Sequence, residues 1–262
     1  MRLKDMVYLQ HLELDKEKDG FHLFLFSVII IVVSMMGQFK RFELMIGEKI
    51  EDVIKSKVLV LGLGGVGSYA VEALVRSGIG SIVLVDYDNI DITNLNRQLM
   101  TTRDNIGKSK TSALVDRIKS INPSCHINTI NKKIDANNIE ELYNKNVDYI
   151  IDACDTLEVK KNLILNCKNK GIKLISCMGT GNKFDPSRLQ IMDIRKTSYD
   201  PIAKILRKFV VENKINYKVM VVCSDEKPLN ISKPIGSNAY VPATAGLLCA
   251  SYVINDIVKE GK

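Results

Sequence analysis

The sequence predicts an α/β fold in which helices flank a mostly parallel sheet. After residue 48, short apolar runs alternate with amphipathic stretches, which is typical of parallel strands joined by crossover helices. A glycine-rich turn follows the first of these runs, in the place where a strand leads into a helix at a nucleotide site. With 262 residues, 46% of them hydrophobic and 26% charged, the chain has the composition of a globular protein rather than a disordered one.

The apolar runs and the stop signals between them place the individual elements. In the first part of the chain, strands are expected at residues 57–61, 81–86, 126–130, 147–152 and 172–177. Helices are expected between them at residues 66–77, 108–121 and 157–170, and Pro123 ends the second. Further on, strands at residues 189–194 and 217–222 flank a basic helix at residues 201–213. A loop over residues 227–242 then leads to an apolar helix at residues 243–258, which we expect to lie in the core.

These elements divide into two expected domains and an extension. Residues 37–178 form the expected nucleotide-binding domain, and residues 179–262 form a smaller C-terminal lobe. Residues 1–36 end in an apolar run of about 16 residues, fewer than the roughly 20 that a membrane-spanning helix needs. A membrane anchor, a buried appendage and a start codon placed too early all remain open for this extension. We expect a cytoplasmic protein, with membrane association if the extension is a real anchor.

Net charge and cysteine content narrow the classes of partner and site. The chain carries 37 Lys and Arg against 30 Asp and Glu, a net charge of +7, which fits a polyanionic partner such as RNA as well as a plain solvated surface. The six cysteines are scattered and contain no Cys-x-x-Cys pair, so structural zinc and a disulfide framework are not expected. We expect every cysteine to be structural, and Cys177 and Cys223 are the candidates if one of them accepts an acyl group.

The strongest local signal is the glycine-rich turn after the first expected strand. Residues 58–67 end in Gly-Leu-Gly-Gly-Val-Gly, in which the glycines let the backbone approach a phosphate and the following helix supplies a positive N-terminus. The expected ligand-binding glycines are Gly62, Gly64, Gly65 and Gly67. Asp86 closes the next strand, where a carboxylate can accept hydrogen bonds from a ribose. A Rossmann-like nucleotide site is therefore predicted, and the glycines alone do not distinguish a dinucleotide from ATP.

Four further motifs follow the glycine turn and decide between these ligands. They are Asp-x-Asp at residues 86–88, Asn-x-Asn-Arg-Gln at 94–98, Gly-x-x-Lys at 107–110 and Asp-x-x-Asp at 152–155. Together they resemble the adenylating domain of ubiquitin-activating enzymes and their bacterial relatives, from about residue 41 to residue 178. The resemblance implies ATP and Mg²⁺ as cofactors and adenylation of a carboxylate as the reaction.

The same resemblance implies a role for each motif residue. Arg97 and Lys110 would hold the phosphates, where negative charge grows as pyrophosphate departs, and Asp155 would hold magnesium. The other implied nucleotide ligands are Asp86 at the ribose, Asp88, and the side-chain amides of Asn94 and Gln98. Arg41 precedes the first strand and is matched to an arginine that reaches the ATP of a partner subunit, so a homodimer is implied.

Residues beyond the nucleotide motifs indicate one branch of this family. The stretches 76–80, 176–189 and 193–207 look like the tRNA threonylcarbamoyladenosine dehydratases, which use ATP to activate the threonine carboxylate of a modified adenosine beside the anticodon and close a ring with loss of water. A basic surface for tRNA phosphates is expected around the helix at residues 201–213. Its positive side chains are Lys196, Lys204, Arg207, Lys208 and Lys214.

Three other functions remain open from the sequence. One is adenylation of the C-terminal carboxylate of a ubiquitin-like or sulfur-carrier protein, with a sulfur-transfer protein as a possible partner; the lack of Cys-x-x-Cys pairs counts against several such branches. A second is an NAD-dependent oxidoreductase, in which Arg97, Lys110 and Asp155 would be idle. The third is a membrane-tethered nucleotide sensor without catalysis.

Overall fold

The computed structural model describes residues 37–228 and 234–260 of the chain. The chain divides into two compact units, Met1–Arg41 and Phe42–Lys262. The extension predicted over residues 1–36 lies outside the described residues, and the fold below is that of the second unit.

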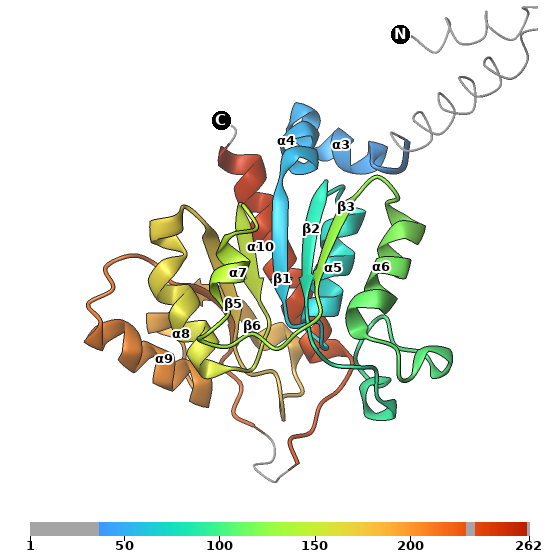
Figure 1. Ribbon diagram of the computed structural model, residues 1–262. Coiled ribbons are helices and arrows are strands. Elements are labelled where there is room, and N and C mark those ends of the chain that lie inside the picture. The colour runs from blue at the N-terminus through green and yellow to red at the C-terminus, as the bar shows by residue number, and fades with distance from the viewer. Residues whose placement is uncertain (1–36, 229–233, 261–262) are drawn as a thin grey trace, which may run out of the picture. The chain divides into compact units, whose positions relative to one another are not determined.

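One mixed sheet forms the centre of this unit, and it contains every named strand of the described residues (Figure 1). Its strands are β1 (Lys57–Leu61), β2 (Ser81–Val85), β3 (His126–Ile130), β4 (Tyr149–Asp152), β5 (Lys173–Cys177), β6 (Leu189–Asp193) and β7 (Met220–Ser224). They lie in the order β3-β2-β1-β4-β5-β7-β6, with only β6 antiparallel to its neighbour. The predicted α/β, Rossmann-like fold is confirmed.

Helices cover both faces of the sheet (Figure 1). The α-helices of the described residues are α3 (Lys40–Ile46), α4 (Ile50–Lys55), α5 (Gly67–Arg76), α6 (Lys110–Ile121), α7 (Glu140–Tyr143), α8 (Leu157–Asn166), α9 (Pro201–Glu212) and α10 (Tyr240–Glu260). Successive side chains of the central strand β1 point to opposite faces of the sheet and so contact different helix layers. Val58 and Val60 pack with residues of α5, α6 and α10, whereas Leu59 and Leu61 pack with residues of α7 and α8.

The C-terminal part of the chain continues the same sheet. β7 pairs in parallel with β5, and β6 adds an antiparallel edge, so the boundary expected after residue 178 falls between paired strands of one sheet. α10 crosses behind the sheet against α5, and a Cβ added at Gly246 would lie 2.2 Å from the carbonyl oxygen of Val66. The two helices approach so closely there that only glycine fits.

The long helix α10 belongs to the core, as expected. Val241, Ala245, Cys249 and Val253 are fully buried in the cluster that also contains residues of α5. Among the described residues, α10 is the helix that is long and apolar enough to cross a membrane, and 56% of that stretch is buried inside the protein.

The switch point of the sheet lies between β1 and β4. β2 and β3 follow on one side of β1, and β4 and β5 on the other, so the loops that leave β1 and β4 diverge to opposite faces and open a crevice at the carboxyl ends of the strands. Leu61 pairs with both Val85 and Asp152 in the register, so three strands end at this same edge.

Candidate nucleotide-binding and active site

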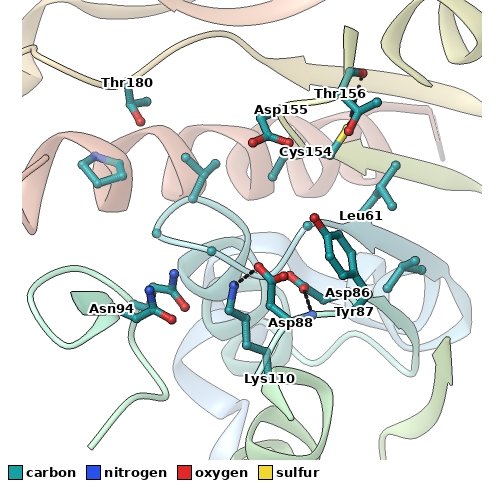
Figure 2. Close-up of a pocket in the computed structure, with 18 of the residues that line it drawn as sticks. Leu61, Asp86, Tyr87, Asp88, Asn94, Lys110, Cys154, Asp155, Thr156 and Thr180 are labelled. Carbon is teal, nitrogen blue, oxygen red and sulfur yellow. Dashed lines mark hydrogen bonds and ion pairs between the residues drawn. The ribbon is translucent and has the colours of Figure 1, made fainter. Parts of the chain in front are cut away.

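A cavity of about 490 Å³ occupies this crevice. Figure 2 shows Asp86, Asp88 and Lys110 on one side of it and Asp155 and Thr180 on the other. The cavity collects nearly all of the residues that the sequence motifs predicted, namely Gly62, Gly64, Gly65, Asp86, Asp88, Asn94, Arg97, Gln98, Lys110 and Asp155. Segments far apart in the sequence therefore meet in one site.

The glycine turn has different requirements at its different positions. Gly62 has a positive φ of 85°, and a Cβ there would lie 2.8 Å from the carbonyl oxygen of Ala153. A Cβ at Gly64 would have only the Gln98 amide nitrogen near it, at 3.8 Å, so a ligand can approach this backbone directly. Gly67 does not line the cavity: its Cβ would lie 1.8 Å from the carbonyl oxygen of Gly62. Gly67 therefore permits close packing of α5 on the turn and acts on a ligand only through that packing.

Asp86 organises the turn around it. Its Oδ2 accepts a hydrogen bond from the backbone N–H of Leu63 at 2.6 Å, and its Oδ1 accepts one from the N–H of Asp88 at 2.8 Å. The side chain is almost completely buried. The predicted role of Asp86 toward a ribose stays a prediction, and the structure adds a second role, which is to fasten the glycine turn to the end of β2.

Asp88 and Lys110 form an ion pair in the cavity. The Lys110 Nζ lies 2.7 Å from Asp88 Oδ2, and the backbone N–H of Lys110 donates to the Asp88 carbonyl at 3.1 Å. The lysine side chain is only 6% exposed, whereas the aspartate side chain is 45% exposed. The carboxylate thus holds a nearly buried ammonium group in place at the start of α6, beside the space where a ligand would lie.

The segment after β2 brings three polar side chains to the cavity. Asn94 accepts a hydrogen bond from the N–H of Asp91 through its Oδ1 at 3.1 Å, and Arg97 Nη1 donates to the carbonyl of Thr93 at 2.8 Å. Gln98 is 6% exposed, and its Oε1 has no hydrogen-bond partner among the described residues. An unsatisfied buried acceptor is unfavourable, so Gln98 is arranged to receive a hydrogen bond from a ligand.

Charged side chains surround Tyr87 at the cavity. The Asp88 carboxylate, together with slight burial and the charges of Asp155 and Asp86, raises the pKa of Tyr87. Lys133 Nζ lies 5.9 Å from the centre of the Tyr87 ring, and both residues line the cavity. The ring is 55% exposed, so it offers a flat apolar face within a strongly polar pocket.

Beneath Asp155 lies a buried ion pair that sequence reasoning missed. Asp152 and Lys160 are both fully buried, and Lys160 Nζ donates to Asp152 Oδ2 at 3.0 Å and to the carbonyl of Cys177 at 2.9 Å. Ser176 Oγ also donates to Asp152 Oδ2, at 2.7 Å, and the N–H of Cys154 donates to Oδ1 at 3.3 Å. This network fastens the turn that carries Asp155 to the end of β5.

The charge of Lys160 is stabilised in spite of its burial. Burial alone lowers the pKa of Lys160, but the neighbouring Asp152 carboxylate more than offsets it, and the net shift is upward. A signal for this residue exists in the sequence, because Lys160 stands on the buried face of α8 with Val159, Leu163 and Ile164. A lysine on an apolar helix face predicts a buried partner.

The cysteines are all free, and burial raises the pKa of several of their thiols. Burial raises the pKa of Cys223 to about 12 and that of Cys125 to about 11. Burial, with the Asp152 charge, raises the pKa of Cys154 still further, although this thiol lines the cavity. Since the thiolate is the nucleophile, Cys223 and Cys154 are not poised to accept an acyl group.

Asp155 is an exposed carboxylate in the cavity that is available to a metal ion. In the described part of the chain, no three His, Cys, Asp or Glu side chains gather to hold a metal ion. Mg²⁺ is commonly bound by one or two carboxylates together with substrate phosphates and water. One exposed carboxylate in the cavity that the glycine turn lines fits that donor set, so the residues present are compatible with the predicted magnesium.

Two other predicted features lie outside the cavity lining. Arg41 is in α3, at the end of the first compact unit, and its role toward a partner's ATP stays a prediction. On the basic helix α9, Arg207 Nη1 donates to the carbonyl and hydroxyl of Thr197, at 2.8 and 2.6 Å, and Lys208 pairs with Glu212 at 3.5 Å. Part of the expected basic surface is therefore occupied in internal contacts.

Comparisons with known proteins identify the family of this chain. In sequence, the chain is 42% identical over 245 residues to the tRNA threonylcarbamoyladenosine dehydratase of Bacillus subtilis, covering 86% of this chain and 96% of that protein. The enzyme of the same name from Haemophilus influenzae is 36% identical, covering 79% and 87%. Among solved structures, Escherichia coli tRNA N6-threonylcarbamoyladenosine dehydratase, TcdA, in complex with ATP is similar with a TM-score of 0.81 and 31% identity, covering 86% and 95%. The model of the ThiF family matches residues 37–258, and the chain belongs to that family.

Proposed function

We propose that this protein is an ATP-dependent tRNA threonylcarbamoyladenosine dehydratase. The observation that carries the proposal is the convergence of Arg97, Lys110 and Asp155 on the cavity that holds the glycine turn. These groups suit phosphoryl chemistry and would have no task in hydride transfer. The names of the relatives, which match along nearly the whole family region, supply the substrate.

Each part of the cavity has a place in ATP binding. The open backbone at Gly64 and the N-terminus of α5 suit the phosphates. Lys110 and Arg97 supply positive charge, and the unpartnered Gln98 Oε1 is available to a donor group of the nucleotide. Asp155 would hold Mg²⁺, which supplies charge neutralisation at the phosphates.

The reaction needs ATP because a carboxylate does not lose oxygen by itself. In the first step, an oxygen of the threonine carboxylate bonds to the α-phosphorus and the bond to pyrophosphate breaks. Arg97 and Lys110 stabilise the charge that grows on the phosphate oxygens. In the second step, a nucleophilic atom of the neighbouring carbamoyl group attacks the activated carbonyl carbon. AMP leaves with the carboxylate oxygen, and the proton released from the carbamoyl group completes the loss of one water.

No enzyme thiol is needed for this sequence of steps. The substrate carries its own nucleophile next to the activated carboxyl group, so an acyl transfer to cysteine would add a step without a task. The raised pKa of the cavity thiol, Cys154, agrees with direct ring closure. The role of the enzyme is then to hold the two reacting groups together and to exclude water.

Pyrophosphate exchange into ATP tests the activation step. Labelled pyrophosphate should enter ATP only when tRNA that carries threonylcarbamoyladenosine is present, because the first step is then reversible on the enzyme. The same tRNA without the modification is the control and should give no exchange. Exchange that instead requires the C-terminus of a ubiquitin-like or sulfur-carrier protein would contradict the proposal and favour the alternative function.

We further propose a cytoplasmic homodimer in which Arg41 serves the site of the partner subunit. Supporting it, α3 carries both Arg41 and two strongly exposed apolar side chains, Leu44 at 75% and Met45 at 80%, which a partner surface could cover. Light scattering should give twice the monomer mass. Mixing Arg41→Ala and Asp155→Ala subunits should restore activity, because such a mixture contains one site with both residues intact.

A further inference from the structure

An exposed aromatic ring, that of Phe184, follows the cavity-lining residue Gly181 by three residues. Phe184 is 60% exposed, and its ring packs edge-on against Tyr240 with 5.6 Å between the ring centres and an angle of 89°. This contact with the first residue of α10 leaves a face of the phenyl ring open. A single exposed apolar side chain is common on protein surfaces. Whether this ring binds a ligand must therefore be judged from its location and from the contacts that fix its backbone.

The position of Phe184 is set by pairing between two loops that border the cavity. The N–H of Asn182 donates to the carbonyl of Gly236 at 2.9 Å, and the N–H of Gly236 donates to Asn182 Oδ1 at 2.6 Å. Asn238 Nδ2 donates to the carbonyl of Lys183 at 2.8 Å. Gly181 and Gly236 both line the cavity, so Phe184 extends its rim.

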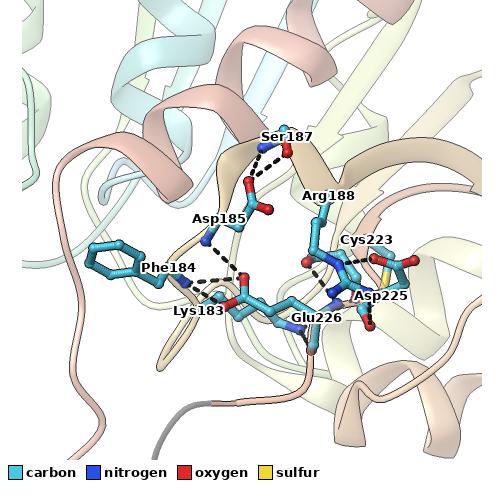
Figure 3. A network of polar contacts seen from close by, with 9 residues as sticks. Lys183, Phe184, Asp185, Ser187, Arg188, Cys223, Asp225 and Glu226 are labelled. Carbon is cyan, nitrogen blue, oxygen red and sulfur yellow. Dashed lines mark hydrogen bonds and ion pairs between the residues drawn. The ribbon is translucent and has the colours of Figure 1, made fainter.

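Two buried charged residues hold the backbone under this ring. Glu226 is 7% exposed and accepts hydrogen bonds from the N–H of Phe184, at 2.9 and 3.1 Å, and of Asp185, at 3.0 Å. Lys183 is 4% exposed, and its Nζ donates to the carbonyls of Ser224 and Glu226, at 3.3 and 2.9 Å. Figure 3 shows the network and the ring projecting from it. Burial of charged groups is costly unless they are hydrogen-bonded, and both of these side chains are.

The side chains around Phe184 carry both signs of charge, with Lys183 and Arg188 beside the carboxylates of Asp185, Asp225 and Glu226, so the surroundings do not select for phosphate. Arg188 Nε pairs with Asp225 Oδ1 at 2.7 Å, and Asp185 Oδ1 accepts from the N–H of Ser187 at 2.9 Å. A fixed, exposed aromatic face without a cluster of positive charge suits a flat apolar ligand. Bases of single-stranded RNA loops are bound in this way, by stacking on aromatic side chains.

We propose that Phe184 is a stacking platform for a nucleobase that neighbours the modified adenosine of the tRNA. The proposal rests on the proposed function, which brings an anticodon loop to this cavity. With one base stacked on Phe184 at the rim, the adjacent nucleotide can reach the cavity and present its carboxylate near Thr180 and Asp155. The ring thus determines the register of the RNA rather than taking part in the chemistry.

A fluorescent RNA tests stacking directly. The probe is an anticodon stem-loop that contains threonylcarbamoyladenosine with 2-aminopurine at the neighbouring position. Wild-type protein should quench the 2-aminopurine fluorescence, whereas Phe184→Ala should not. Phe184→Leu keeps an apolar side chain without an aromatic face and should behave like the alanine variant, and Phe184→Trp should restore the quenching. Ile54→Ala, at a 49% exposed position on α4, is the matched control and should resemble wild type.

Steady-state kinetics with modified tRNA test the proposal a second way. Base stacking on an aromatic side chain is strong enough that Phe184→Ala should raise KM for tRNA about tenfold to a hundredfold. KM for ATP should stay unchanged. The salt dependence of tRNA binding should also keep its slope, because no phosphate contact is lost.

Quenching that survives in Phe184→Ala, or in Phe184→Leu, would overturn the stacking proposal. An apolar peptide that displaces the RNA probe from the ring would also overturn it, in favour of a protein partner. Failure of the proposed function is distinguishable, because the wild-type protein would then give no ATP-dependent product, whereas failure of stacking alone would leave that product and remove the difference between wild type and Phe184→Ala.

Discussion

Substitution of Lys160 by methionine should destabilise the protein strongly. Methionine has a similar length and no hydrogen-bond donor, so the change removes the ammonium group and little volume. Lys160 and Asp152 are both fully buried, and the Lys160 Nζ makes two contacts, at 3.0 Å to Asp152 Oδ2 and at 2.9 Å to the Cys177 carbonyl. Loss of one partner of a buried ion pair costs about 3–5 kcal/mol. Because Ser176 Oγ still donates to Asp152 at 2.7 Å, we expect the lower end, about 3 kcal/mol.

Urea unfolding measures this loss directly, and a thermal melt should show a Tm lower by about 6–12 °C, at 2–4 °C per kcal/mol for a domain of this size. Lys161→Met is the matched control, because Lys161 pairs with the exposed Glu158 at 2.7 Å and lies 5.7 Å from the centre of the Phe209 ring without a buried charge partner, and it should change the free energy of unfolding by about 1 kcal/mol or less. The double variant with Asp152→Asn should recover part of the loss. If the Lys160→Met protein is as stable as the Lys161→Met protein, the buried ion pair between Asp152 and Lys160 does not stabilise the fold.

Three further changes separate catalysis, packing and ionisation. Asp155→Asn should lower pyrophosphate exchange about 100-fold or more and leave urea unfolding unchanged, because Asp155 is exposed; near-normal exchange would remove it from the mechanism. Gly67→Ala should cost about 1–3 kcal/mol of stability, since its Cβ would lie 1.8 Å from the Gly62 carbonyl oxygen, whereas Gly64→Ala should fold normally and weaken ATP binding measured by calorimetry. Stability should fall as pH rises above about 9, because thiols of the unfolded chain ionise there while burial keeps the pKa of Cys223 at about 12; urea midpoints that stay constant from neutral pH to pH 10 would contradict this.

Local patterns in the sequence predict the elements of the central sheet well. The spans expected for β1 and β3 agree with the observed Lys57–Leu61 and His126–Ile130, because short apolar runs bounded by turns define them. The strand expected at residues 217–222 is wrong by a shift, since pairing of β7 begins where Met220 meets Ile175 of β5. The Tyr217 hydroxyl group instead donates a hydrogen bond to the carbonyl of Ile164. Pairing with a distant strand sets that boundary, and such pairing is not visible locally.

The short helices α3, α4 and α7 were not predicted. α7 has only four residues, Glu140–Tyr143, and its stability comes from packing Leu142 and Tyr143 into the core rather than from local helix propensity. The apolar face that fixes α7 is completed by other segments of the chain. Sequence patterns within so short a stretch cannot distinguish it from a loop.

The candidate site shows the same division between local and distant causes. The motifs identify the residues that line the cavity, because each motif combines a strand end with the groups that a nucleotide needs. They do not reveal that Gly67 acts through packing, nor that Asp152 and Lys160 support the turn below Asp155. Those roles depend on contacts between elements, which a motif does not contain.

Mass spectrometry of nucleosides tests directly whether the protein dehydrates threonylcarbamoyladenosine in tRNA. Modified tRNA is incubated with the purified protein and magnesium, with and without ATP, and digested under mild conditions that preserve a cyclic product. We expect threonylcarbamoyladenosine to lose one water only when ATP is present, with formation of AMP and pyrophosphate in equal amounts. An unchanged nucleoside in the presence of protein that binds ATP would contradict the assignment as a dehydratase.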